Sequence, residues 1–361
     1  MWADIANSPC LPTTIDLRPG EALDGYLERV ADVNYLTTAH LLTQVRARAD
    51  TTRFLMLAPS PATLRTLAAI TGETVEHLQE ATLARYDGNA LDLTGLDPQR
   101  QSSFRTVAAR GWLPGHGTQI CPACLAETGT WAIAWRLPTS TVCDRHGTYL
   151  LAACPGCHRP FRDQRHSHLR AVGATTRCGN PLGEGPRAQC QLALTTLKAP
   201  PADPECLARH QRQVLAGSGL PVTVFGEPAR PLEYAATLQA LTVLLLHVAS
   251  ATTTPHDLPA WTAHLAADGD TRPHRWALHP PADPAVRSRA LTTADTLLST
   301  PDIDTAAAVF TTWCEKVPVT PDGRLGWLAD HTRMTPTLTR LVMATHAPAA
   351  APPGSWRIIR R

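Results

Sequence analysis

Hydrophobic residues recur at helical spacing near the start of the chain. One apolar stripe combines four residues spaced i, i+4, i+7 and i+8, namely Leu23, Leu27, Val30 and Ala31. The pattern opens at Glu21, directly after a Pro19-Gly20 turn, and a second periodic segment spans residues 37–45. The sequence therefore predicts two amphipathic helices here.

Two shorter helices follow, joined by a glycine. Ser60 and Pro61 form an N-cap and a first helical position, and Thr74 caps the next helix after the break at Gly72. The residues predicted to face inward are Leu64, Leu67, Ala68 and Ile70, then Val75, Leu78 and Leu83. This arrangement is typical of a helix-turn-helix.

The second of these helices is an acidic one. It carries Glu73, Glu76 and Glu80, with only His77 and Gln79 suited to reading base edges. Because carboxylates repel phosphates, three interpretations stay open: DNA reading, protein docking and simple packing.

The C-terminal part predicts a further set of helices after the linker APPADP. They span 204–216, 232–250, 257–267, 284–299, 303–316 and 336–346. The longest apolar run, residues 238–249, is too short to cross a membrane and predicts a buried helix, so we expect no membrane partner.

Residues 324–346 form a second helix-turn-helix candidate. We expect four leucines inside, Leu325, Leu328, Leu338 and Leu341, and Arg333 and Arg340 outside. Any helical hairpin has the same pattern, so the alternative stays open.

Charge is distributed unevenly although the net charge is only +2. The balance is −6 over residues 1–99, +8 over 100–198 and 0 over the remainder. The basic middle part suits an acidic partner such as DNA. Neither Lys198 nor Lys316 follows a glycine, which excludes a P-loop ATPase.

The first ten residues show no secretory signal, so we expect a cytoplasmic, nucleoid-associated protein. Its ten cysteines are then expected to be metal ligands or core residues rather than disulfides. Cys10, Cys206 and Cys314 fall outside any metal spacing and are expected to be plain thiols.

The remaining cysteines and one histidine form a regular array of eight ligands: Cys121, Cys124, Cys143, His146, Cys154, Cys157, Cys178 and Cys190. Zinc takes four such ligands, often offered as pairs with two residues between them. The array predicts two structural Zn²⁺ ions per chain. A sequential grouping, first four and last four, is favoured over a cross-braced one. Both sites would be closed to water, which argues against metal hydrolysis.

A basic patch lies between the ligands of the second site. It contains Arg159, Arg162, Arg165 and Arg170, together with His158, His166 and His168. We expect it to contact nucleic acid, the alternative being a solvated loop. Trp131 and Trp135, four residues apart, predict a short helix whose aromatic rings pack on the zinc module.

Three segments resemble one known family. They are RPGEALDGYLERVA (18–31), ICPACLAETGTWAIAWRLPTSTVCDRHGTYLLAACPGCHRP (120–160) and CGNPL (178–182). Together, over about residues 15–195, they resemble the TniQ family of transposon target-selection proteins. Ala22 stands in place of the usual serine and His158 in place of a glycine, and neither change removes a ligand.

The resemblance implies an accessory factor that is not itself an enzyme. Such proteins bind an attachment site in DNA or an RNA-guided complex, and they recruit an AAA+ ATPase that engages the transposase. Many are two-fold dimers, so a homodimer is a further partner to consider. The alternative function is a zinc-containing helix-turn-helix transcription regulator. A nuclease is disfavoured because no HExxH motif or acidic constellation accompanies the metal region.

The predicted fold is mainly α, with helix-turn-helix lobes flanking a zinc-stabilised double zinc finger. We expect an N-terminal helical lobe at 1–105, the double zinc-finger module at 106–198, a C-terminal helical lobe at 199–346 and a flexible basic tail at 347–361.

Overall fold

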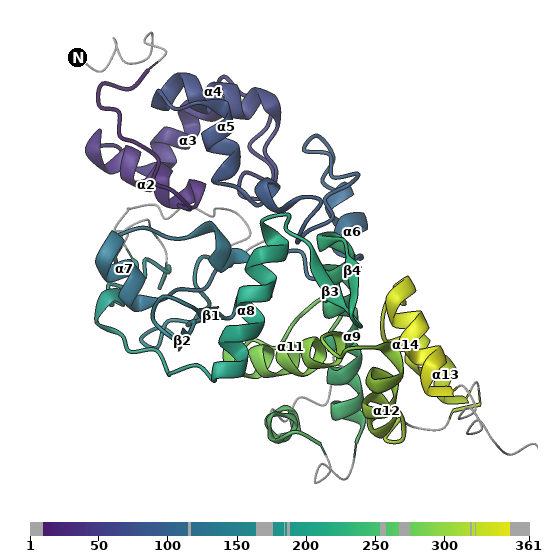
Figure 1. Ribbon diagram of the computed structural model, residues 1–361. Helices are drawn as coiled ribbons and strands as arrows, with labels where there is room; N and C mark the ends of the chain where they lie inside the picture. Colours follow the sequence, from purple (N-terminus) through teal and green to yellow (C-terminus); the bar gives the residue numbers. More distant parts are fainter. Residues whose placement is uncertain are drawn as a thin grey trace, which may run out of the picture.

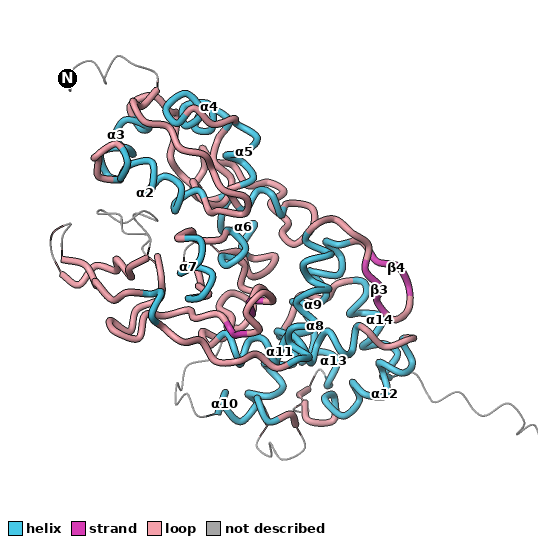
Figure 2. Tube along the Cα trace, turned by 60° about the vertical axis from the view of Figure 1, so that its left-hand side comes forward, coloured by secondary structure: helices cyan, strands magenta, loops and turns pink. Residues whose placement is uncertain are grey.

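The structure is a computed structural model that describes residues 10–114, 117–163, 176–183, 185, 188–252, 258–266, 275–317, 320–321 and 323–346, without the side chains of residues 264 and 266. The predicted tail lies outside these ranges. The described chain is mainly helical and carries two Cys/His clusters, which confirms the predicted fold class (Figures 1 and 2).

The described part of the N-terminal lobe, drawn in purple to blue in Figure 1, contains six helices. They are α2 (Leu23–Val33), α3 (Thr38–Arg46), α4 (Pro61–Thr71), α5 (Val75–Glu80), the 3-10 helix η1 (Leu83–Tyr86) and α6 (Ser103–Ala108). All four residues of the predicted first stripe are buried. Helix α2 begins two residues later than expected because Glu21 forms a β-bridge with Ala132 instead.

The predicted caps of α4 and α5 are confirmed. The hydroxyl of Ser60 accepts from the backbone N–H of Thr63, and that of Thr74 accepts from His77. Between the helices Gly72 has φ +80°, a left-handed conformation that favours glycine. The first helix-turn-helix candidate is thus a pair of capped helices, α5 having only six residues.

The metal segment, residues 117–198, has few regular elements among its described residues, which appear mostly as loop in Figure 2. Its elements are α7 (Pro122–Thr128), η2 (Ile133–Arg136), β1 (Val142–Cys143), β2 (Thr148–Tyr149) and η3 (Leu194–Thr196). Strands β1 and β2 pair antiparallel, with Val142 opposite Tyr149. Trp135 lies in the short helix η2 as predicted, whereas Trp131 precedes it. Both rings are buried beside the cluster cysteines.

The C-terminal lobe is a helical bundle with one hairpin. Its elements are α8 (Pro204–Gly217), β3 (Val222–Val224), β4 (Glu227–Ala229), α9 (Pro231–Ala251), η5 (Ala260–Thr262), α10 (Ala263–Ala266), α11 (Pro284–Leu298), α12 (Ile303–Cys314), α13 (Gly323–His331) and α14 (Pro336–His346). The hairpin β3–β4, with Val224 opposite Glu227, has no counterpart in the sequence predictions.

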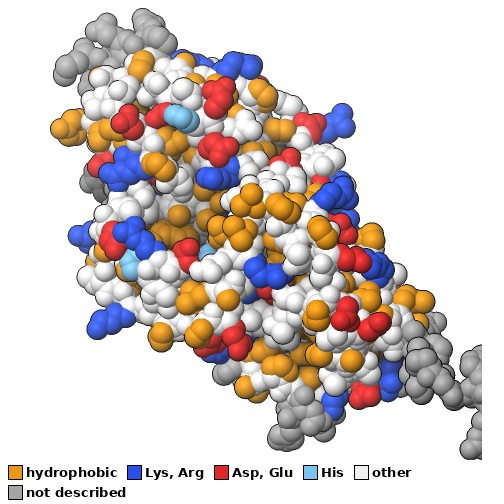
Figure 3. Space-filling view, in the orientation of Figure 1, with side chains coloured by type: hydrophobic (Ala, Val, Ile, Leu, Met, Phe, Trp, Pro, Cys, Tyr) orange, Lys and Arg blue, Asp and Glu red, His pale blue; other side chains and the backbone are white. Residues whose placement is uncertain are grey.

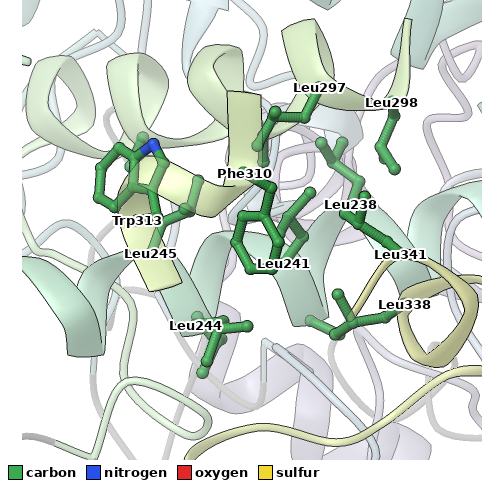
Figure 4. Close-up of a cluster of buried hydrophobic side chains, with 14 of the residues drawn as sticks. Leu238, Leu241, Leu244, Leu245, Leu297, Leu298, Phe310, Trp313, Leu338 and Leu341 are labelled. Carbon is green, nitrogen blue, oxygen red and sulfur yellow. The ribbon is translucent and has the colours of Figure 1, made fainter. Parts of the chain in front are cut away.

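Helix α9 is the centre of this lobe. Phe310 and Trp313 of α12, and leucines of α11 and α14, surround its apolar residues Leu241 and Leu245 (Figure 4). By length and composition α9 could span a membrane, but 67% of its apolar window is buried inside the protein. The apolar character of α9 is therefore explained by its position as the core helix of this lobe.

The second helix-turn-helix candidate corresponds to α13 and α14. Leu328, Leu338 and Leu341 are buried as predicted. Leu325 is 39% exposed, so its predicted burial was wrong. Helix α13 packs against α9 through Trp327 and Leu328, which are buried. This orientation leaves Leu325 on the exposed side of the helix.

The lobes share their cores across the predicted boundaries. Trp112 belongs to the core around α9, and its indole N–H donates to the carbonyl of Trp276 at 2.6 Å. Ile133 and Leu137 of the metal segment belong instead to the N-terminal core. The space-filling view shows charged side chains of both signs dispersed over one face, with a hollow between the N-terminal lobe and the metal segment (Figure 3).

Candidate metal centres

Cys121, Cys124, Cys143 and His146 form the first cluster. Cys121 caps α7, Cys124 lies in its first turn, Cys143 ends β1, and His146 follows in the β1–β2 turn. The Nδ1 atom of His146 lies 3.5, 3.2 and 3.5 Å from the sulfurs of Cys121, Cys124 and Cys143 respectively. The sulfurs of Cys124 and Cys143 are 3.5 Å apart.

These separations fit a tetrahedral metal ion. With metal–sulfur bonds of about 2.3 Å and metal–nitrogen bonds of about 2.0 Å, tetrahedron edges are about 3.8 Å between sulfurs and about 3.6 Å from sulfur to nitrogen. The four donor atoms can therefore hold one ion with little rearrangement. Disulfides are ruled out in this arrangement, since an S–S bond is about 2.05 Å long.

Glu127 contacts the His146 ring of the first cluster at the nitrogen that does not face the sulfurs. Its carboxylate lies 3.0 Å from the Nε2 atom of His146 and 2.8 Å from Arg145. The hydrogen bond that Nε2 of His146 donates to the Glu127 carboxylate raises the pKa of His146 and orients the ring so that Nδ1 faces the sulfurs. The sequence analysis missed this residue; its position three residues after Cys124 on a helix was the available signal.

The second cluster contains Cys154, Cys157, Cys178 and Cys190. The sulfurs of Cys154 and Cys190 are 3.8 Å apart, as are those of Cys157 and Cys178. These are again tetrahedron edges for a metal bound by four sulfurs. Asn180, also missed from the sequence, donates from its amide to the Cys157 sulfur at 3.5 Å and to the carbonyls of Arg159 and Pro160.

The eight predicted ligands thus come together in the sequential grouping and not in the cross-braced one. Within each group the thiols hydrogen-bond one another, which lowers the pKa of Cys121 and raises that of Cys124. Each group offers four protein donors, so a tetrahedral ion would be fully coordinated. The three other cysteines lie outside both groups, as predicted.

The residues of the predicted basic patch fall into three groups according to where the structure places them. Arg159 is exposed and donates to the carbonyl of Pro181 at 2.6 Å. Arg165 and Arg170 lie outside the described residues, as do His166 and His168. Arg162 is buried, with 4% of its surface exposed, so its predicted place on a nucleic-acid surface is wrong.

Arg162 is buried because two carboxylates of α2 bind it. Its guanidinium lies 2.5 Å from Asp24 and 2.9 Å from Glu28, and it stacks 4.1 Å from the centre of the Trp131 ring. Arg136 of η2 also pairs with Asp24. This buried ion network joins the N-terminal lobe to the loop that follows the Cys154-x2-Cys157 pair.

A second set of buried arginines attaches the metal segment to the C-terminal lobe. Arg209 of α8 donates to the carbonyl of Thr139 and to the hydroxyl of Thr141. Arg287 of α11 donates to the carbonyl of Pro138 and to Gln119 at 2.6 Å. Burial lowers the pKa of Arg287 to about 10. The loop leading to Cys143 is therefore held by hydrogen bonds from two helices.

The exposed face of α5 is acidic, as the sequence indicated. Glu76 and Glu80 are exposed beside His77 and Gln79, while Glu73 bonds the backbone N–H of Leu17 at 2.7 Å. A duplex phosphate backbone would meet negative charge there.

Comparison with models of protein families identifies a match for the first part of the chain. Residues 12–150 match the TniQ family model, a stretch that includes α2, the Asp24 and Glu28 carboxylates and the whole first cluster, and ends before the second. A search of curated proteins gave no significant match. By this match, residues 12–150 of the chain are similar to the TniQ family, which is associated with DNA transposition.

Proposed function

We propose that this protein is a non-catalytic adaptor for DNA transposition that recruits an AAA+ ATPase and its transposase to target DNA or to an RNA-guided complex. The observation that carries the proposal is the TniQ match, which covers the first cluster and the α2 carboxylates that attach the N-terminal lobe to the metal segment. Such an adaptor would work in the cytoplasm, at the nucleoid.

The two clusters suit structural Zn²⁺ ions in particular. Three thiolates with an imidazole, and four thiolates, are donor sets that zinc takes in closed tetrahedral sites. When bound, each ion would cross-link loops that have little secondary structure of their own. The domain division at 106–198 is proposed on this basis, since both ions would lie within it.

The chain's own residues would provide attachment rather than chemistry. Arg159 is exposed in the loop that follows Cys157 and is proposed to contact nucleic acid. Arg165 and Arg170 are proposed to extend that contact. The short capped helices α4 and α5, with the acidic outer face of α5, are better suited to a protein partner such as the ATPase or a second copy of the chain.

A transposition assay tests this function. The gene is deleted from a host that also carries neighbouring ATPase and transposase genes, and insertion frequency is counted with and without a plasmid copy. We expect insertions at the specific target to require the plasmid copy, and purified protein to retain the ATPase in a pull-down. Unchanged insertion, together with altered transcript levels, would instead favour the transcription regulator.

A further inference from the structure

A pocket of about 340 Å³ lies between the N-terminal and C-terminal lobes. Its wall is built from the loop after η1, the end of α6, the first turns of α9 and the turn between α13 and α14. Three arginines line it, one from each of the last three segments: Arg110, Arg230 and Arg333. Segments far apart in the chain thus bring three arginines to the wall of one cavity.

Two of these three charges have no carboxylate partner. Arg110 is paired with Asp92 at 3.1 Å. Arg333 donates to the backbone carbonyl of Arg110 at 3.1 Å, and the guanidinium of Arg230 makes no ion pair or hydrogen bond with the described residues. The other acidic group of the pocket, Glu233, accepts a hydrogen bond from Thr337 at 2.7 Å.

Backbone groups add to the positive character. Arg230 is the N-cap of the 21-residue helix α9, and Pro336 begins α14, so both helices point their N-termini at the pocket. The unpaired N–H groups at a helix N-terminus favour anions. Apolar side chains complete the wall, including Leu232 and Met334.

We propose that this pocket binds the phosphate ester of a nucleotide unit. The guanidinium fork matches phosphate oxygens in two hydrogen bonds, and the apolar wall can contact a sugar or base. The volume lies within the range of small-ligand sites. The inference rests on the proposed function, because it assigns DNA contact to residues other than the basic patch of residues 158–170. The nucleotide unit could come from DNA or from a free nucleotide.

The test compares the wild type with the double variant Arg230→Ala/Arg333→Ala. The matched control is Arg340→Ala, which removes an exposed arginine of α14 that pairs with Glu227 and does not line the pocket. Binding of a fluorescent duplex of mixed sequence is measured by anisotropy over a range of salt concentrations, and binding of deoxythymidine monophosphate is measured by calorimetry.

The double variant should bind the duplex about tenfold more weakly, and its salt slope should fall by about 0.9 for each lost phosphate contact. The control should retain affinity and slope. Binding of the free mononucleotide by the wild type and its loss in the variant would show that the site accepts a free nucleotide, whereas a loss confined to the duplex would identify DNA as the source.

Equal duplex affinity and slope in the wild type and the double variant, together with no difference between them in mononucleotide binding, would overturn the pocket proposal. The adaptor function would still stand, because the transposition assay tests it separately. Arg230→Lys/Arg333→Lys guards against misfolding. It keeps both charges, so it should retain part of the duplex affinity and the full salt slope, and loss of both would also contradict the proposal.

Discussion

The guanidinium of Arg162 lies 2.5 Å from the carboxylate of Asp24, across 138 residues of sequence and inside the protein. Asp24 is on the first helix of the N-terminal lobe, and Arg162 follows the first two ligands of the second cluster by five residues. This buried ion pair therefore links the N-terminal lobe to the loop that follows Cys157 of the second cluster.

Asp24→Asn is expected to destabilise the protein by about 3–5 kcal/mol, because it leaves Arg136 and Arg162 buried with one carboxylate fewer. The measurement is the free energy of unfolding in urea. Glu227→Gln is the control, since its ion pair with Arg340 is exposed and is expected to contribute less than about 1 kcal/mol. Equal stability of Asp24→Asn and the wild type would contradict the role of this network.

Metal content is expected to be about two zinc ions per chain by elemental analysis, because each cluster offers one closed set of four donors. Cys143→Ser should lower this to about one and reduce the yield of folded protein. Cys10→Ser should leave both unchanged, as this thiol lies outside the clusters. A stable, fully folded protein after chelation would show that the metals are not structural.

Glu127→Gln is expected to weaken zinc binding at the first cluster by about 10–100-fold, because the His146 ring loses the carboxylate that orients it. Competition with a coloured chelator should resolve one weakened ion and one unchanged ion. The second cluster serves as an internal control. If the zinc affinity of both clusters falls equally, the effect is a general loss of stability and not the loss of an orienting contact.

Tyr35→Gly is expected to stabilise the protein by about 0.5–1 kcal/mol. Tyr35 directly follows the C-cap of α2 and has φ +56°, a conformation in which a side chain is strained. The residue is 92% exposed, so little packing is lost. Thermal unfolding measures the change. Phe54→Gly is the comparison, since Phe54 has the same φ but packs on Phe104, and it should destabilise. A lower melting temperature for Tyr35→Gly would contradict the strain argument.

Local patterns in the sequence were sufficient for the parts of the protein that depend on near neighbours. The stripe from Leu23 to Ala31, the caps at Ser60 and Thr74 and the buried run of α9 follow from helical periodicity and capping, which act within a few residues. The ligand spacing likewise identified the eight side chains that gather in two clusters suited to a metal ion, because zinc sites use pairs close in sequence.

Only the tertiary structure decided which charged side chains are buried and which of them lie close together. Arg162 belongs to a run of arginines that indicates a basic surface, yet carboxylates more than 130 residues away bury it. Arg110, Arg230 and Arg333 show no local pattern, yet three chain segments bring them to one pocket. Charge pairing depends on through-space distance and on burial, and neither can be calculated from spacing along the chain.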